Sequence, residues 1–304
     1  MGLVNLSVLS ALVVKKIKIM EKLKIAIQKS GRLSDDSIEL LKQCGMSFSS
    51  MGNKLIASVT NFPLEILYLR DDDIPQYVQD GVADIGIIGE NVLIEKEKKV
   101  DIAEKLGFGK CRLSIAIPRG EIFDDVSYLN GKKIATSYPK ILKNYLSENN
   151  VSATIEEISG SVEIAPGIGL ADVVCDIVSS GSTLLTNGLK EAETIFRSEA
   201  VLIKNGNISA EKNKIIEQLL FRIRAVNKAK QFKYVLLNIP TKNIPKVKSI
   251  LPGMKSPTIL PLALEGWSSL HSVISEDDFW SVIDQLKEIG AQGILIVPIE
   301  KMVI

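Results

Sequence analysis

Residues 163–184 contain the side chains whose types and spacing are best suited to chemistry on a phosphorylated sugar. Asp172 and Asp176 lie on a run of β-branched residues, which is typical of a strand. The run ends in a turn of small and hydroxyl-bearing residues, whose backbone N–H groups can form a nest for an anion. These turn residues are Ser179, Ser180, Gly181, Ser182 and Thr183. Carboxylates beside a nest of phosphate size predict a phosphorylated sugar and a metal ion.

Each of these residues also has an ordinary structural interpretation. A turn rich in Ser and Gly often does no more than precede a helix, and a single carboxylate is often a solvated group or a helix cap. The one histidine, His271, has apolar neighbours that favour a packed or interface residue over a catalytic base. The sequence contains no Walker P-loop, and neither Gly107-x-Gly109 nor Gly167-x-Gly169 has the third glycine of a dinucleotide fingerprint.

Composition limits the class of protein and of ligand. With 304 residues, 46% of them apolar and 24% charged, the chain can fill cores in two or three domains. A net charge of +1 argues against nucleic acid or an anionic membrane as the main partner. Cys44, Cys111 and Cys175 are too scattered for a disulfide framework or a zinc site. We therefore expect a globular cytoplasmic protein that binds small molecules.

The first nineteen residues differ in character from the rest. Their apolar run precedes Lys15, Lys16 and Lys18, whereas a signal peptide has the reverse order of charge, and about eleven apolar residues cannot span a bilayer. We interpret residues 1–19 as a non-native or disordered extension, with Met20 as the true initiator.

The elements that must position the candidate residues alternate between strand and helix from Met20 onward. Residues 28–33 are predicted to form a polar loop, and Ser34 to be the N-cap of the helix that follows it, which ends at Gly45. Strand, loop and helix N-terminus together are where α/β proteins bind anions. The predicted elements are strand 24–27, helix 34–41, strand 65–69 and helix 74–79, with Asp71, Asp72 and Asp73 in the first turn of the last helix.

A short internal echo suggests two similar lobes. Residues 83–85 and 171–173 both read Ala-Asp followed by a branched residue, and both open an apolar strand that ends in a turn with glycine. In the segment 84–91, Gly86 and Gly89 predict the close approach of a ligand or of another backbone. Two such units predict two α/β lobes with a ligand cleft at the carboxyl ends of their parallel strands.

Residues 112–118 are predicted to form a buried strand at a crossing between the lobes. The second lobe then begins at residues 132–139 with a strand and a hydroxyl-bearing turn, continues with a helix over 140–149, and closes near residues 194–201, where the chain returns.

The last part of the chain follows a β-α-β-β-α-β order after a helix over 210–228. Ser275 and Asp278 predict a capping box, and Gly290 predicts the end of that helix. This order is that of a ferredoxin-like module. Its predicted elements are strand 232–239, helix 241–250, strands 257–264 and 267–274, helix 276–289 and strand 293–299.

Taken together, these motifs resemble the long form of the ATP phosphoribosyltransferase family, which begins histidine biosynthesis. The family signature runs Glu, five residues, Gly, any, small, two, branched, any, Asp, branched, two, Ser/Thr, Gly, any, Thr, Leu/Met. It is matched at every position from Glu163 to Leu184. The similarity covers Lys22 to the C-terminus and includes the runs 29–33, 70–75, 84–91 and 136–139.

The resemblance implies that N1 of ATP attacks C1 of 5-phosphoribosyl-1-pyrophosphate (PRPP), which releases pyrophosphate. Such a displacement builds positive charge on the sugar and negative charge on the leaving group, which Mg²⁺ and phosphate-binding amides must stabilise. Glu163, Asp172, Asp176 and the turn 179–183 are then expected to bind PRPP. The signature favours Glu163 and Asp176 over Asp172 as the residues that hold Mg²⁺.

The resemblance also implies nucleotide contacts, a regulatory domain and an oligomer. Arg32 offers a bidentate fork to phosphate. Catalytic residues stay unassigned. The expected nucleotide contacts are Lys29, Arg32, Asp84, Glu90 and Tyr138. The last domain is expected to sense histidine as a feedback inhibitor, with the chain forming dimers and hexamers.

We therefore predict an α/β fold with a two-lobed catalytic region, like that of periplasmic binding proteins, and a C-terminal ferredoxin-like, ACT-like regulatory domain. The alternative function is a two-lobed small-ligand binding protein without catalysis, which would not need the 163–184 constellation. The predicted divisions are residues 1–19 as an extension, 20–120 plus 195–225 as lobe I, 121–194 as the PRPP-binding lobe II, and 226–304 as the regulatory domain.

Overall fold

The protein is described here from a computed structural model. It describes residues 21–48, 55–179, 181–251, 253 and 256–303. The predictions for residues 1–19 and for Ser180 lie outside these ranges.

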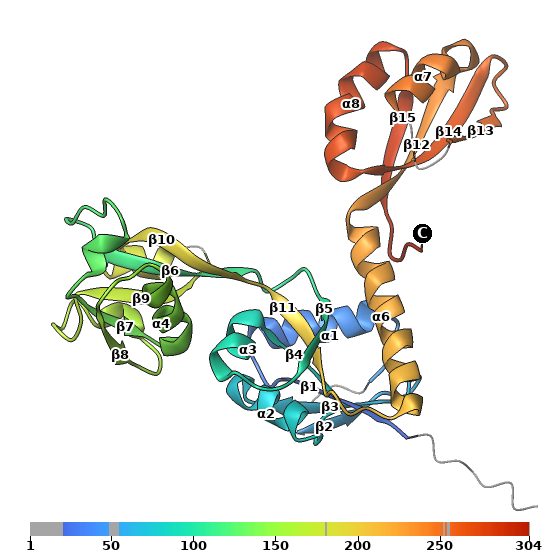
Figure 1. The fold of residues 1–304 in the computed structure, drawn as a ribbon. Coiled ribbons are helices and arrows are strands. Elements are labelled where there is room, and N and C mark those ends of the chain that lie inside the picture. The colour runs from blue at the N-terminus through green and yellow to red at the C-terminus, as the bar shows by residue number, and fades with distance from the viewer. Residues whose placement is uncertain (1–20, 49–54, 180, 252, 254–255, 304) are drawn as a thin grey trace, which may run out of the picture.

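The first lobe is a six-stranded sheet covered by helices on both faces (Figure 1). Its parallel strands β1, β3 and β4 are almost continuously apolar, as expected for strands that are buried on both sides. Residues of α1 and α6 pack on one face, and residues of α2 pack on the other. The strand order is β2 (Ile56–Ser58), β3 (Leu64–Leu69), β1 (Leu23–Gln28), β4 (Ile85–Gly89), β11 (Ala200–Lys204) and β5 (Asp101–Lys105). Its helices are α1 (Arg32–Gln43), the 3-10 turn η1 (Asp71–Asp73), α2 (Ile74–Gln79) and α3 (Glu90–Lys96).

The second lobe is a five-stranded mixed sheet. Its three parallel strands, β9, β7 and β8, are joined by the antiparallel strands β6 and β10. The strand order is β10 (Leu189–Ser198), β6 (Cys111–Pro118), β9 (Val173–Val178), β7 (Lys133–Thr136) and β8 (Thr154–Glu157). The other elements of this lobe are α4 (Pro139–Glu148), α5 (Ser182–Thr186) and the 3-10 turns η2 (Val126–Leu129) and η3 (Val162–Ile164).

The sheets move the lobe boundary away from the one that we predicted. The strand β6 was expected in the first lobe, but it pairs with β9 and β10 in the second, which also contains all of β10. The crossings are therefore residues 106–110 and Glu199. An apolar sequence indicates that a strand is buried, and it does so equally for both sheets. The residues of β6 alone therefore do not tell to which of the two sheets it belongs.

Three local predictions in the first lobe need correction. Ser34 is not an N-cap, because α1 begins two residues earlier, after Gly31, whose φ of 95° suits glycine. The predicted strand 84–91 ends at Gly89, and α3 begins immediately after it. A Cβ at Gly86 would lie 2.7 Å from Cγ2 of Ile74, so the close approach there comes from a helix side chain.

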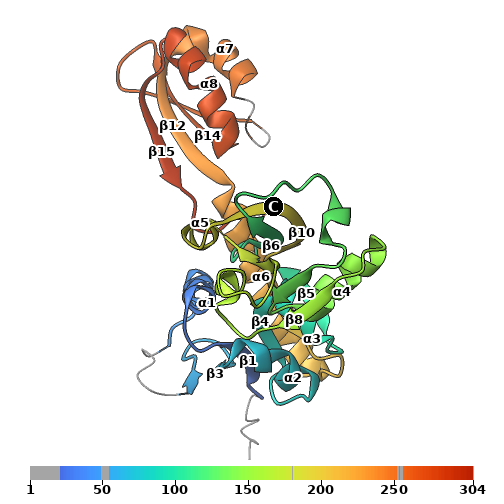
Figure 2. The same ribbon diagram turned by 90° about the vertical axis from the view of Figure 1, so that its left-hand side faces the viewer.

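The C-terminal domain has the predicted β-α-β-β-α-β order, and its sheet is antiparallel throughout. Its sheet stands beyond the far end of the 21-residue helix α6 (Ala210–Lys230) in both views (Figures 1 and 2), and α7 and α8 cover one face of the sheet. The elements are β12 (Phe232–Pro240), η4 (Thr241–Asn243), α7 (Ile244–Ile250), β13 (Thr258–Pro261), β14 (Trp267–Ser275), α8 (Glu276–Glu288) and β15 (Gln292–Pro298), in the sheet order β13, β14, β12, β15.

Details of this domain agree with the sequence. The capping box is confirmed, since the Asp278 N–H donates to Ser275 Oγ over 3.1 Å. His271 lies within the sheet, where its ring nitrogens contact Tyr234 Oη at 2.9 Å and Ser269 Oγ at 3.1 Å, as a packed histidine should. After β15 the chain returns to α6, where the Met302 N–H donates to the Ala225 carbonyl over 2.9 Å. None of the helices in the described residues is both long and apolar enough to cross a membrane.

Candidate active site

A cavity of about 400 Å³ collects most of the residues predicted to bind the sugar. Glu163 reaches it from η3, Asp176 from β9, and Arg32 from the first turn of α1 in the other lobe. The remaining lining residues are Ile177, Val178, Ser179, Gly181, Ser182, Thr183 and Leu184. One cavity therefore joins the two ends of the 163–184 motif, although Glu163 and Asp176 are thirteen positions apart in the sequence.

The turn after β9 is shaped by its glycine and fixed by an arginine. Gly181 has a φ of 80°, which a residue with a Cβ adopts only with strain, and it precedes the first residue of α5. Arg112 donates to the Ser179 carbonyl over 3.2 Å and forms a bidentate pair with Glu191. The hydrogen bond from Arg112 lowers the pKa of the Glu191 carboxyl to about 2. The charged pair of Arg112 and Glu191 thus holds the backbone of the turn in place at Ser179.

The carboxylates of Glu163 and Asp176 lie in the smaller cavity, where Asp176 is partly shielded from solvent. Burial raises the pKa of Asp176, and the charge of Glu163 raises it further, while a backbone N–H at Ile177 opposes the shift. A cation between these groups would relieve both the burial penalty and the repulsion. Within the described parts of the chain, no group of three or more His, Cys, Asp or Glu side chains is placed to hold a metal ion.

A second cavity of about 610 Å³ lies between the lobes and adjoins the first, since Arg32, Ile177 and Ser179 line both. The second lobe contributes Tyr138 and Cys111. The first lobe and its crossing contribute Gln28, Leu33, Asp71, Gly89, Asn91, Val92, Gly109 and Lys110. The molecule therefore has one long cleft with an acidic end and a wider end.

Tyr138 is held in the cleft as a neutral hydrogen-bond donor. Asn91 donates to Tyr138 Oη over 3.1 Å, and its own carbonyl accepts from Ser198 Oγ at 2.8 Å, which fixes the direction of the amide. Burial raises the pKa of Tyr138, and the charge of Asp176 raises it further. Its oxygen accepts from Asn91, so the hydroxyl proton remains available for donation in the cavity that Tyr138 lines.

The other predicted nucleotide contacts are distributed differently. Arg32 lines both cavities, as its assignment requires. Lys29 is exposed and lines neither cavity. Glu90 also lines neither and instead forms an ion pair with Lys105 at 3.0 Å. The cleft thus brings together Arg32 and Tyr138, while the nucleotide contacts of Lys29 and Glu90 stay predictions from the sequence.

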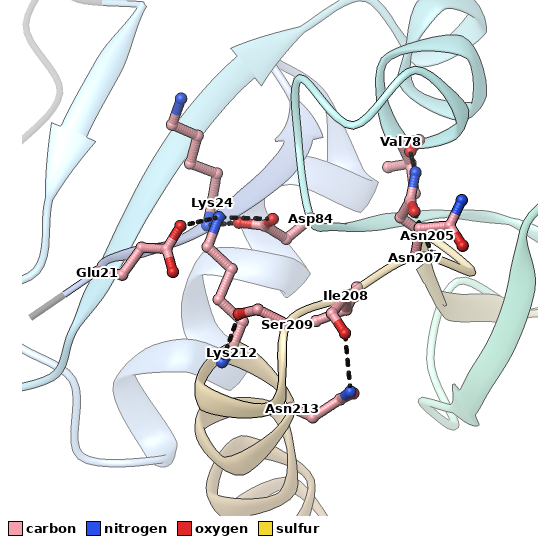
Figure 3. A network of polar contacts seen from close by, with 10 residues as sticks. All are labelled: Glu21, Lys24, Val78, Asp84, Asn205, Asn207, Ile208, Ser209, Lys212 and Asn213. Carbon is pink, nitrogen blue, oxygen red and sulfur yellow. Dashed lines mark hydrogen bonds and ion pairs between the residues drawn. The ribbon is translucent and has the colours of Figure 1, made fainter.

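Asp84 lies at the end of its strand opposite the residue that lines the cavity. It precedes β4, whereas the cavity residue Gly89 ends that strand, roughly 17 Å away at the usual rise per residue. Its carboxylate accepts from the Lys24 N–H at 2.8 Å and pairs with Lys212 Nζ at 2.9 Å, with both side chains largely buried. Figure 3 shows that this network joins β1 and β4 to the start of α6.

Asp172 repeats the arrangement of Asp84 in the second lobe. Its carboxylate accepts from the Lys133 N–H at 2.8 Å, and its own N–H donates to the Lys133 carbonyl over 2.9 Å. Asp84 makes the same two-way contact with Lys24. The sequence echo is therefore a structural device that joins the amino ends of two parallel strands. Asp172 lines neither cavity, and its contacts are those of a structural residue.

Sequence reasoning missed several residues of the cleft. Asp71 was interpreted as a helix-end acid within the run 70–75 of the resemblance, and Asn91 as part of the run 84–91, both without a role of their own. Arg112 was placed on a strand without a role. For Asn91 a signal was available in the sequence, since it lies two residues after Gly89, the last residue of its strand. Side chains at the carboxyl ends of parallel strands meet at one edge of the sheet.

Comparison with known proteins decides the family. A family model described as HisG, ATP phosphoribosyltransferase, matches residues 70–225, and one described as HisG, C-terminal domain, matches residues 229–301. The chain belongs to the ATP phosphoribosyltransferase family. The presence of both regions confirms the long form, and membership confirms a phosphoribosyltransferase of histidine biosynthesis over a binding protein without catalysis.

Relatives support the family over nearly the whole chain. ATP phosphoribosyltransferase of Cytophaga hutchinsonii is 62% identical over 281 residues, covering 92% of this chain and 98% of the relative. That of Bacteroides thetaiotaomicron is 54% identical, covering 93% of this chain and 100% of the relative. A solved ATP phosphoribosyltransferase complex, HisG:HisZ from Thermotoga maritima, contains a chain that is 30% identical with a TM-score of 0.57. The match covers 96% of that chain but 66% of this one.

Proposed function

We propose that the smaller cavity binds PRPP and the larger one binds ATP, so that N1 of ATP reaches C1 of PRPP where the cavities meet. The observation that carries this assignment is the convergence of Glu163, Asp176 and the turn 179–183 on one cavity that opens into the interlobe cleft. Phosphoribosyl-ATP and pyrophosphate are the products, and this is the first committed step of histidine biosynthesis.

In this proposal the turn after β9 binds the 5-phosphate, and the acidic end binds the ribose. The backbone N–H groups and hydroxyls around Gly181 suit a phosphate. Arg32 reaches both cavities, so it is placed to contact the pyrophosphate or the triphosphate with a bidentate fork.

Glu163 and Asp176 fit a magnesium ion. Mg²⁺ is commonly held by one or two protein carboxylates together with substrate phosphates. Glu163 and Asp176, which line one cavity and are near enough for their charges to interact, provide two such carboxylates. When bound, Mg²⁺ would neutralise charge that develops on the pyrophosphate. The two carboxylates position the ribose hydroxyls, and Tyr138 donates its proton near the junction of the cavities.

We also propose roles for the domains and the assembly. Lobe II, with the corrected sheet boundary, binds PRPP. The C-terminal domain, residues 226–304, is a ferredoxin-like, ACT-like regulatory module that binds histidine and inhibits the enzyme allosterically, with a change between dimer and hexamer. Its strand order β13-β14-β12-β15 supports this proposal. Free thiols at Cys44, Cys111 and Cys175 accord with the cytoplasmic location expected from the sequence.

The direct test is turnover by the purified chain. ATP, PRPP and MgCl₂ should yield phosphoribosyl-ATP, followed by its absorbance or by isotope from labelled ATP, and omission of any one component should abolish the product. A protein that binds PRPP but gives no product with Mg²⁺ present would contradict the proposal and support binding without chemistry.

A further inference from the structure

Asp71 places an unassigned carboxylate in the wider part of the cleft. It is the first residue of η1, one residue beyond the carboxyl end of β3, and it lines the cavity that we assign to ATP. Its Oδ1 is buried and has no hydrogen-bond partner among the described residues. A buried carboxylate oxygen without a hydrogen bond is costly to keep, so an unpaired one in a cavity wall indicates a place for a ligand donor.

The groups that face Asp71 make it a base near neutral pH. Burial raises the pKa of Asp71 to about 6, the charge of Asp72 on the same turn raises it further, and Lys96 of α3 opposes the shift. Tyr138, from the second lobe, is close enough to Asp71 and Asp176 for both charges to raise its pKa. Arg32 lines the same cavity. Tyr138 thus lies near both the carboxylate of the sugar end and that of the nucleotide end.

Attack by N1 of adenine makes a proton of the N6 amino group acidic. As the N1 lone pair bonds to C1 of PRPP, the bond from C1 to the pyrophosphate oxygen breaks, and its electron pair leaves with pyrophosphate. The adenine ring then carries a positive charge, which acidifies the N6 amino group. Loss of one N6 proton leaves its bonding pair on nitrogen and gives the neutral imino form of the alkylated ring.

We propose that Asp71 accepts a hydrogen bond from the N6 amino group of ATP and takes up one of its protons as N1 is alkylated. This inference rests on the assignment of the larger cavity to ATP. It makes Asp71 both the residue that recognises adenine and the general base of the reaction, and it supplies the donor that the buried Oδ1 lacks.

The first test separates base from acceptor with two variants. Asp71→Asn keeps an acceptor oxygen but not the base, so kcat with ATP should fall about 10²- to 10³-fold with the KM for PRPP within about twofold. Asp71→Ala should also abolish the preference for ATP over purine riboside triphosphate, which lacks the N6 group, measured as the ratio of their Kd values. Asp72→Asn is the matched control, because that neighbouring side chain is 71% exposed, and at neutral pH it should keep the wild-type kcat and preference for ATP.

The second test is the pH profile. The ionised form of Asp71 is the base, so wild-type kcat/KM for ATP should fall as pH drops below about 6, and this fall should vanish in Asp71→Asn. Asp71→Glu should restore part of the rate and the pH dependence. An Asp71→Asn enzyme with wild-type kcat and pH profile, or an Asp71→Ala enzyme that still prefers ATP, overturns the assignment of Asp71 alone. Absence of wild-type turnover would overturn the proposed function as well.

Discussion

The carboxylates of the two lobes divide by the end of the strand at which they lie. Asp176 is near the carboxyl end of β9 and faces a cavity, while Asp172 precedes the same strand and binds the backbone of Lys133. A shift of four positions in the sequence thus separates a cavity-facing acid from a structural one. Side chains at opposite ends of a strand perform different tasks even when their types are identical.

Substitution of Asp176 should therefore affect chemistry, and substitution of Asp172 should affect stability. We expect Asp176→Asn to lower kcat by about 10²-fold and to raise the Mg²⁺ concentration needed for half-maximal rate, because a charged ligand is lost. We expect Asp172→Asn to keep kcat and to lower the free energy of unfolding by about 1 kcal/mol. Steady-state kinetics with a Mg²⁺ titration and urea unfolding check the pair, and equal kinetic loss in both variants would contradict the division.

The buried pair of Lys212 and Asp84 should matter for stability alone. Its side chains are 16% and 11% exposed, so Lys212→Met leaves the Asp84 carboxylate buried without its cation. The free energy of unfolding should fall by about 3–5 kcal/mol. KM values should not change, because the pair lies at the end of β4 opposite the cleft. Thermal unfolding and kinetics measure both effects, and a raised KM for ATP with unchanged stability would argue for a ligand contact after all.

At the scale of elements, the sequence predicted which segments form strands and helices better than where they begin and which neighbours they have. The helix that we expected at Ser34 starts at Arg32, because the backbone conformation of Gly31, rather than a capping side chain, sets the turn out of β1. The start of α3 directly at Glu90 was missed, because its motif was interpreted as one strand. The family signature predicted residues that line the smaller cavity. Asp71 and Asn91 lie outside that signature, and only the folded chain brings them into the wall of the adjoining cavity.

Packing of α2 on β4 depends on the absence of a side chain at Gly86. A Cβ there would lie 2.7 Å from Ile74 Cγ2 and 3.1 Å from Val78 Cγ2 in a filled interior. Gly86→Ala should lower the free energy of unfolding by about 1–3 kcal/mol through overpacking. Gly206→Ala is the matched control, since nothing lies within 4 Å of its added Cβ, and it should be near neutral. Equal midpoints of chemical unfolding for the two variants would show that α2 can shift at no cost.

At the scale of the whole molecule, α6 connects the three parts. Its apolar side chains belong to the core of the first lobe, and Asn227 donates to the carbonyl of Leu106 in the crossing segment over 3.1 Å. Arg224 pairs with Glu104 at 2.7 Å, just before that segment. The helix that leads to the C-terminal domain therefore contacts the crossing segment between the lobes directly.

Removal of the C-terminal domain should separate inhibition from catalysis. The cut belongs after Gln231 rather than near residue 228, because α6 continues to Lys230 and contributes to the core of the first lobe. We expect the truncated chain, residues 20–231, to fold, to keep measurable turnover and to lose inhibition by histidine. Circular dichroism and inhibition curves test this. Full histidine inhibition in a folded truncation would place the sensor elsewhere.

The bond from Met302 to Ala225 has a practical consequence for such measurements. The chain leaves α6 to build the last domain and then returns to the same helix, so both ends of that domain lie close to the lobes. A fluorescent label attached at the C-terminus would therefore report on the junction with the lobes, while the outer tip of the domain would pass unobserved. A label at Leu264, which is 64% accessible and lies in the turn between β13 and β14 beyond the far end of β12, would follow the tip instead.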